Sequence, residues 1–282
     1  MDENAQSKTD VKSQDMFTLV NNYFLLFFCA SCMISSMYVQ QLFFVLNQYR
    51  TGIGVSAALG IIVPVYLLSR RFGSGFREQL RIAQPRAPQA VYVLLATLCA
   101  VAVVDQIYLI SQQFMPAPDY YAETLKDLKP TGGWTFALTF AGLCVLVPFA
   151  EELVFRGYVQ QIFSRNMGPV AGFLLAGTLF GASHLNAHLL VSITFFGVFL
   201  GFIFYATGNL TYTIISHSLF NTVALLQLTS SAGPDEETTI PFYLRDDRIL
   251  VIALVLLVYF LFKLKQGGAE TDPPWEEKDD AS

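Results

Sequence analysis

Eight apolar segments, each close to the length that crosses a lipid bilayer, follow one another along the chain. They span about residues 16–38, 52–70, 89–111, 134–163, 170–186, 188–207, 210–229 and 248–264. A helix that crosses a bilayer needs about 20 consecutive apolar residues, because its backbone amides must be bonded within the segment. Only 14% of all residues are charged, which is low for a water-soluble domain of this size. The sequence therefore predicts an all-α, polytopic membrane bundle of about eight transmembrane helices.

The charges of the loops predict how these segments are oriented. The loop after the second segment carries Arg70, Arg71, Arg77, Arg81 and Arg86. Short basic loops remain in the cytoplasm, so eight crossings would place both termini on the cytoplasmic side. We expect an integral protein of a bacterial cell membrane, or of the endoplasmic reticulum membrane if the source is eukaryotic.

Ionisable side chains are scarce in the fourth to seventh segments. Between residues 134 and 229 the fixed charges are Glu151, Glu152, Arg156 and Arg165, and all three histidines of the chain lie in the same stretch. A charge in hydrocarbon costs about 2.5–3.5 kcal/mol on insertion scales, so such groups face a protein interior or a wet cavity and mark function. Chemistry is therefore expected in this stretch.

Two adjacent glutamates have different expected roles. Glu152 and Arg156 are four residues apart and share a helix face, so the arginine can neutralise that carboxylate. Glu151 is rotated by about 100° from Glu152 and can point elsewhere. The spacing thus leaves Glu151 free to act as a general base.

Two further patterns add imidazole and amide groups. The small residues 181–183 precede His184 and let another helix approach closely. His217 and Asn221 are four residues apart, so both face one way and can hold a water molecule or an oxyanion.

Helix lengths indicate whether these groups meet. Glu151 and His184 each lie about 16 residues, roughly 24 Å, from the turn near 166–169, so a hairpin brings them to the same depth. His217 lies only about nine residues, roughly 13 Å, past the turn near 208–209. Tilt, or a deeper start of the seventh segment, must close that gap.

The three patterns occur in the order Glu151-Glu152-x-x-x-Arg156, Phe180-x-x-x-His184 and His217-x-x-x-Asn221. In this order, each within an apolar segment, they resemble the CPBP family, the CAAX-protease and bacteriocin-processing group, whose members are similar to the CAAX prenyl endopeptidase. The resemblance implies a membrane endopeptidase that hydrolyses a peptide bond with an activated water, from a cavity open to the cytoplasm. It implies the catalytic residues Glu151, His184, His217 and Asn221, with Glu152 and Arg156 as support.

No cofactor is favoured for this site. Catalytic zinc usually has three protein ligands and a water, and two histidines with a glutamate reserved as the base leave too few. A divalent metal such as zinc stays open as the alternative, and Glu151, His184 and His217 would then be its ligands.

The predicted organisation has five parts. Residues 1–15 and 266–282 are polar tails expected to be disordered; 16–133 hold the first helices, 134–229 the catalytic core, and 230–265 an outer loop and the last helix. Membrane lipid and a peptide or membrane-protein substrate are the expected partners, and no nucleic acid is expected. The alternatives are a non-proteolytic scaffold or immunity protein of the same fold, and a proton-coupled carrier.

Overall fold

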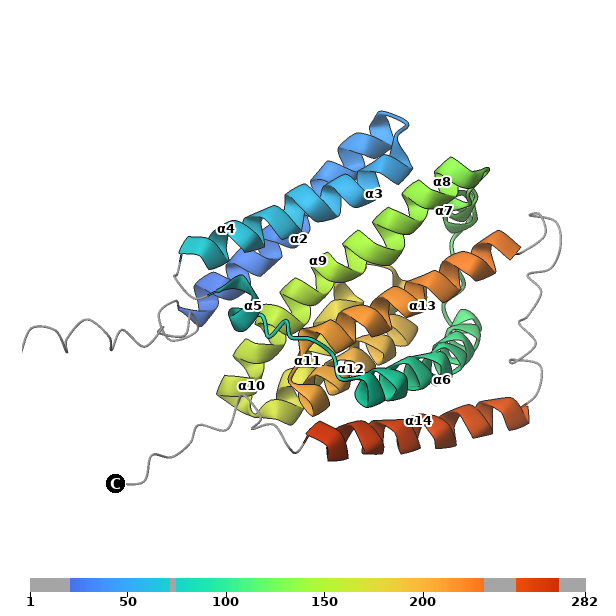
Figure 1. The fold of residues 1–282 in the computed structure, drawn as a ribbon. Coiled ribbons are helices and arrows are strands. Elements are labelled where there is room, and N and C mark those ends of the chain that lie inside the picture. Colours follow the sequence, from blue (N-terminus) through green and yellow to red (C-terminus); the bar gives the residue numbers. More distant parts are fainter. Residues whose placement is uncertain (1–20, 72–74, 231–246, 269–282) are drawn as a thin grey trace, which may run out of the picture.

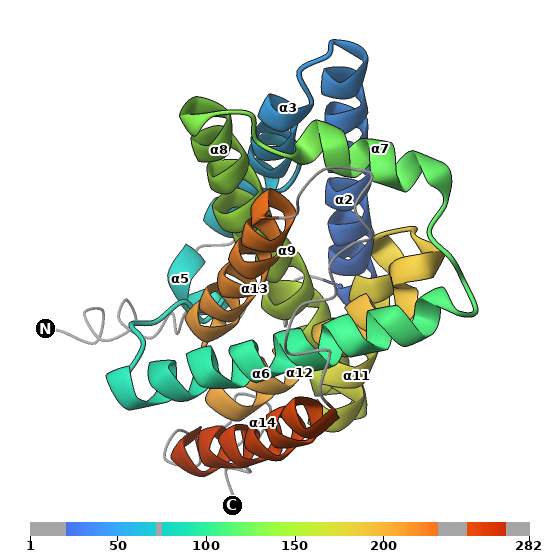
Figure 2. The ribbon, with the colours of Figure 1, turned by 90° about the vertical axis from the view of Figure 1, so that its right-hand side faces the viewer.

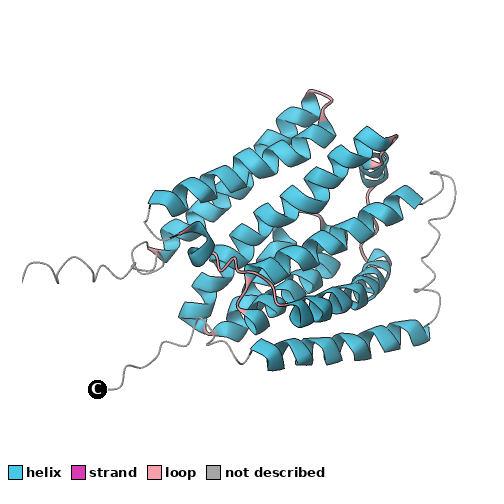
Figure 3. Cartoon of the chain, in the orientation of Figure 1, coloured by secondary structure: helices cyan, strands magenta, loops and turns pink. Residues whose placement is uncertain are grey.

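The chain folds into a bundle of helices in a computed structural model (Figures 1 and 3). The structure describes residues 21–71, 75–230 and 247–268, and these contain no strand. In chain order the elements are α2 (Asn22–Val45), α3 (Tyr49–Ala57), η1 (Ala58–Ile62), α4 (Val63–Arg71), α5 (Phe76–Gln79), α6 (Ala87–Gln112), α7 (Asp119–Leu128), α8 (Gly133–Thr139), η2 (Phe140–Leu146), α9 (Val147–Val154), η3 (Phe155–Gln160), α10 (Gln161–Met167), α11 (Pro169–Ser183), η4 (Ala187–Leu189), α12 (Leu190–Thr207), α13 (Leu210–Ser230) and α14 (Asp247–Gly268). The all-α fold class predicted from the sequence is confirmed.

Each of the eight predicted segments coincides with a helix or a run of joined helices. Within the described ranges, six of these runs are long and apolar enough to cross a membrane. The two others are α11, which has only 15 residues, and α13, which has 21 residues and includes the polar residues Ser216, His217 and Asn221. The protein is an integral membrane protein, while the count of eight crossings and the orientation of the termini stay predictions.

The helices are arranged around a central group made of α9, α11, α12 and α13. The hairpin of α2 and α3–α4 lies along one side of this group, and α6 and α14 lie along the other (Figure 1). Helices α11 and α12 pack closely, since a Cβ atom at Gly177 would lie 2.5 Å from the backbone nitrogen of Val198. Helix α7 crosses the end of the bundle near the α2–α3 turn (Figure 2).

The fourth segment is an irregular helix. Two π-helical stretches, η2 and η3, lie directly before and after the α-helix α9. Pro148 lies at the start of α9 and has no amide hydrogen to donate to the preceding turn. π-Helical insertions are rare and frequent at functional sites. The sequence analysis assumed a regular helix here, and that assumption is wrong.

The start of α13 is covered by the loop that follows α5. The backbone nitrogen of Leu210 donates to the carbonyl of Arg81 at 2.9 Å, and Asn209 exchanges two hydrogen bonds with the backbone of Ala83. Leu210 is fully buried. The first residue of the seventh segment is therefore covered by protein, and the same helix places His217 2.9 Å from Glu152.

Three of the expected regions fall wholly or mostly outside the described residues. These are the tails, 1–15 and 266–282, and most of the loop between α13 and α14. Residues 266–268 are the exception, because α14 continues through them to Gly268. The last helix is thus longer than the boundary at 265 predicts.

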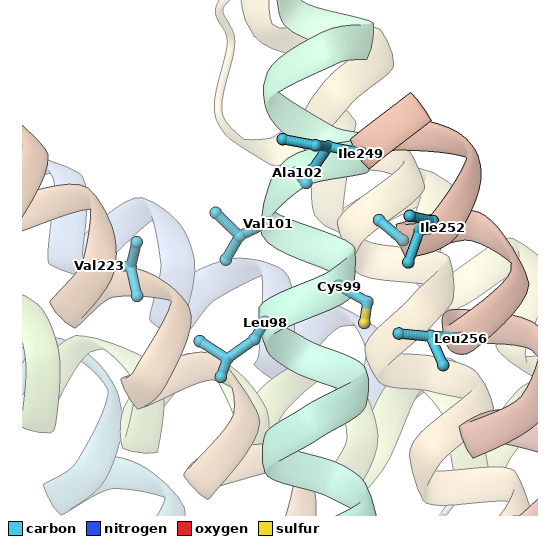
Figure 4. A pocket seen from close by; sticks show the side chains of 9 residues that line it. Leu98, Cys99, Val101, Ala102, Val223, Ile249, Ile252 and Leu256 are labelled. Atoms are coloured by element: carbon cyan, nitrogen blue, oxygen red, sulfur yellow. The ribbon is translucent and has the colours of Figure 1, made fainter. Parts of the chain in front are cut away.

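An apolar pocket of about 460 Å³ lies between α6, α13 and α14. Its wall includes Val101 from α6, Val223 from α13 and Ile252 from α14 (Figure 4). No residue predicted to be catalytic lines this pocket, so it is separate from the chemistry described next.

Candidate active site

Glu152 is held in a buried ion pair. Arg156 Nη1 donates to Glu152 Oε1 at 2.8 Å, and both side chains are fully buried. Arg156 Nη2 donates to the carbonyl of Gly197 on α12 at 2.6 Å. Since Arg156 lies in η3 and Glu152 in α9, the pair spans the junction between the α-helical and π-helical stretches and ties it to α12.

His217 lies between the two glutamates. Its Nδ1 is 2.9 Å from Glu152 Oε1, and its Nε2 is 3.8 Å from Glu151 Oε2. An ionised carboxylate only accepts hydrogen bonds, so Nδ1 carries the proton and donates to Glu152. That bond fixes the ring with Nε2 directed at Glu151. The contact between His217 and Glu152 was not predicted from the sequence, where no spacing rule links residues on different helices.

His184 is oriented by its own helix. It caps the C-terminus of α11, and its Nδ1 lies 2.8 Å from the carbonyl oxygen of Phe180. Because a carbonyl oxygen only accepts, Nδ1 of His184 carries a proton and donates it to this bond. The bond fixes the orientation of the ring.

The ring of Phe180 packs against three of the site's side chains. Its centroid is 4.9 Å from that of His184 and 5.6 Å from that of His217, both edge-on. The guanidinium carbon of Arg156 lies 4.8 Å from the same centroid. A second ring, that of Phe196, packs edge-on against His217 at 5.5 Å. Phe196 was not predicted to lie at the site, because aromatic residues are common throughout the apolar segments.

Glu151 lines a pocket of about 470 Å³ together with Ser183 and His184. The side chain of Glu151 is 15% exposed, whereas that of Glu152 is fully buried. Glu151 is therefore the carboxylate of this pair that a substrate or a water molecule can reach. The pocket also brings Glu151 and His184 together from α9 and α11, as their matched depth predicts.

Asn221 is engaged elsewhere. Its Nδ2 donates to the carbonyl of Leu143 in η2 at 2.8 Å. Neither Asn221 nor His217 is among the residues that line the pocket. The structure thus brings His217 to the glutamates but does not bring Asn221 to the pocket wall.

The family comparison covers the helices that hold these residues. Residues 133–223 match the family described as type II CAAX prenyl endopeptidase Rce1-like. We call residues 133–223 the Rce1-like domain after this match. It runs from the first residue of α8 into α13 and contains every predicted site residue, so the resemblance inferred from the three patterns is confirmed. Searches of curated proteins and of solved structures give no match.

The Rce1-like domain supplies only one side of the pocket. Val147, Ala150, Glu151, Ser183 and His184 belong to it. The remaining lining residues come from α2, α3 and η1, which precede the matched residues. The sequence analysis found no motif in those helices and assigned them no role.

The residues of the Rce1-like domain do not converge as a metal site would. In the three described ranges, no group of three or more His, Cys, Asp and Glu side chains could hold a metal ion. The absence of a cofactor stays a prediction, and Glu151, His184 and His217 stay the ligands of the alternative.

The position of the pocket sets two expectations against each other. On α2 it is lined by residues 33–41, and on the following helix by residues 49–61, so it lies in the half of the bundle nearer the α2–α3 turn. The arginines Arg70 and Arg71 lie at the opposite end, in the last turn of α4. The loop charges predict that the end with these arginines is cytoplasmic. The pocket would then lie nearer the other side of the membrane. This disagrees with the cavity open to the cytoplasm that the resemblance implies.

Proposed function

We propose that the protein is an intramembrane endopeptidase in which Glu151 activates a water molecule for attack on a peptide carbonyl. The observation that carries this proposal is the difference between the two glutamates. Glu152 binds both Arg156 and His217, whereas Glu151 lines the pocket together with His184. The Rce1-like domain supports peptidase activity as the reaction class.

The reaction needs one base and a means to stabilise negative charge. Glu151 takes a proton from water while the water oxygen bonds to the carbonyl carbon. Glu151 then returns that proton to the amide nitrogen and the C–N bond breaks. An amine and a carboxylic acid leave, and the acid loses its proton to solvent. His184, through Nε2, is proposed to orient the water.

His217 and Asn221 complete the proposed catalytic group. The Nε2 of His217 lies 3.8 Å from Glu151 Oε2 and is proposed to hold the same water molecule, with Glu152 and Arg156 keeping the imidazole in place. Asn221 is proposed to act through the backbone of η2, because its amide already binds Leu143. Oxyanion-hole donors are worth about 10²–10³ in rate, so the effect of Asn221→Ala measures whether it has such a role.

The substrate is proposed to be a peptide segment at or in the membrane, of the CAAX type that the family description names. This extends to a prenylated C-terminal tail or to a membrane-protein segment, with membrane lipid as the surrounding partner. The reaction is proposed to need no metal, and full activity after treatment with a zinc chelator would support this.

The test compares wild-type protein with Glu151→Gln in proteoliposomes. Gln keeps the shape of the side chain but cannot take a proton, so we expect cleavage to fall by at least about 10²-fold. Mass spectrometry of the peptide products measures the rate and the bond that is cut. Glu123→Gln, on the exposed face of α7, is the matched control and should retain wild-type activity. Full activity of the Glu151→Gln protein would refute the proposal.

A further inference from the structure

The wall that faces Glu151 across the pocket comes from the hairpin of α2 and α3. On α2 the lining residues are Met33, Ser36, Met37, Gln40 and Gln41. They are spaced by three or four residues along the helix, so they form one continuous face. The next helix adds Tyr49, Ile53, Ser56, Ala57 and Ile61. We call these ten residues the hairpin wall.

The hairpin wall is held in place by close packing and by hydrogen bonds of its own. A Cβ atom at Gly60 would lie 2.5 Å from the Cα atom of Ser36, so η1 and α2 touch through their backbones. Gln40 accepts a hydrogen bond from the Ser56 hydroxyl and donates one to the carbonyl of Tyr49, both at 3.3 Å. The wall is thus formed without a ligand.

The chemistry of the hairpin wall is uncharged. It presents amide and hydroxyl groups among apolar side chains, and among all fifteen residues that line the pocket Glu151 carries the one fixed charge. Glutamine amides both donate and accept hydrogen bonds, so they can bind the backbone of an extended peptide. A charged substrate side chain would have no opposite charge here apart from Glu151, and burying an unpaired charge is costly.

We propose that the hairpin wall is the substrate-binding surface of the enzyme and that it selects an extended peptide segment with uncharged residues beside the bond that is cut. Gln40 and Gln41 bind the backbone of this segment. Met33, Met37 and Ile61 contact its apolar side chains. The proposal rests on the proposed endopeptidase function and adds the substrate class and the residues that determine it.

The test uses three membrane-anchored peptides that differ at one position next to the cleaved bond, which carries Leu, Lys or Asp. For the wild-type protein, we expect the Leu peptide to be cleaved at least about tenfold faster than either charged peptide, because an unpaired charge in the pocket is penalised. Gln41→Lys should raise the rate on the Asp peptide relative to the Leu peptide. Gln41→Glu should do the same for the Lys peptide.

Gln48→Lys is the matched control, because Gln48 is an exposed residue of the same hairpin that does not line the pocket. It should leave all three relative rates unchanged. If the Gln41 variants also leave the relative rates unchanged, the hairpin wall does not select the substrate.

Binding separates this inference from the proposed reaction. Dissociation constants of the three peptides, labelled with a fluorophore, are measured with wild-type protein and with Glu151→Gln. The order of affinities, and its change in the Gln41 variants, is expected in both backgrounds. If no peptide is cleaved but these affinities shift as expected, the proposed reaction is wrong, whereas the proposal that the hairpin wall binds the peptide is supported. Equal affinities for all three peptides would refute the proposal that the hairpin wall selects the substrate.

Discussion

Replacing Arg156 by methionine should destabilise the protein more than any single surface change. Arg156 and Glu152 are both fully buried, and their atoms are 2.8 Å apart. Removing the cation leaves the Glu152 carboxylate buried without its charge partner, and breaking a buried pair in this way costs about 3–5 kcal/mol. At about 1.4 kcal/mol for each factor of ten, the ratio of folded to unfolded protein should fall by roughly two to four powers of ten.

The free energy of unfolding can be measured by denaturant titration in detergent micelles, followed by circular dichroism. Arg165→Met is the matched control, because Arg165 is exposed at the end of α10; exposed ion pairs contribute up to about 1 kcal/mol. The double variant Glu152→Gln/Arg156→Met removes both charges and should recover most of the loss. If Arg156→Met costs no more than Arg165→Met, or if the double variant recovers nothing, the pair does not stabilise the site as described.

The remaining predictions address the imidazole, the packing and the orientation. Glu152→Gln should lower the cleavage rate at least about tenfold while the peptide affinity stays unchanged, because His217 loses the carboxylate that orients it; a wild-type rate would contradict this role. Gly177→Leu should lower the free energy of unfolding by about 1–3 kcal/mol, because its side chain meets the backbone of α12, and unchanged stability would contradict the close packing. Gln48→Cys should react with a membrane-impermeant maleimide in intact cells, because the loop charges place the α2–α3 turn outside; protection would reverse the orientation.

The helices were predictable because their signal is local. An apolar run of about 20 residues needs no information from elsewhere in the chain, and each of the eight runs contains a helix among its described residues. The pairing of Glu152 with Arg156 was predictable for the same reason, since the two residues are close in sequence. It survives although η3 begins at Phe155, because both ends of the pair lie within one turn of that junction.

The contacts between helices were not predictable in the same way. Counting residues from a turn gives the depth of a side chain but not its direction or the position of the turn. His217 meets Glu152 across 65 positions of the sequence, and the start of α13 is bonded to the backbone of Arg81 and Ala83. Asn221 shares a face with His217 by spacing, yet its amide binds Leu143 on a π-helical stretch. The irregular backbone of that stretch is set by tertiary packing and is weakly encoded in composition.

The two faces of the Glu151 pocket are encoded far apart in the gene, one before residue 62 and the other after residue 146. Under the proposed function, sequence changes in the first stretch would alter which peptides are bound while the residues proposed to be catalytic stay unchanged. Proteins that share only the motif-bearing helices could thus differ widely in the substrates that they bind. Exchanging the hairpin of α2 and α3 between such proteins should then transfer the substrate preference.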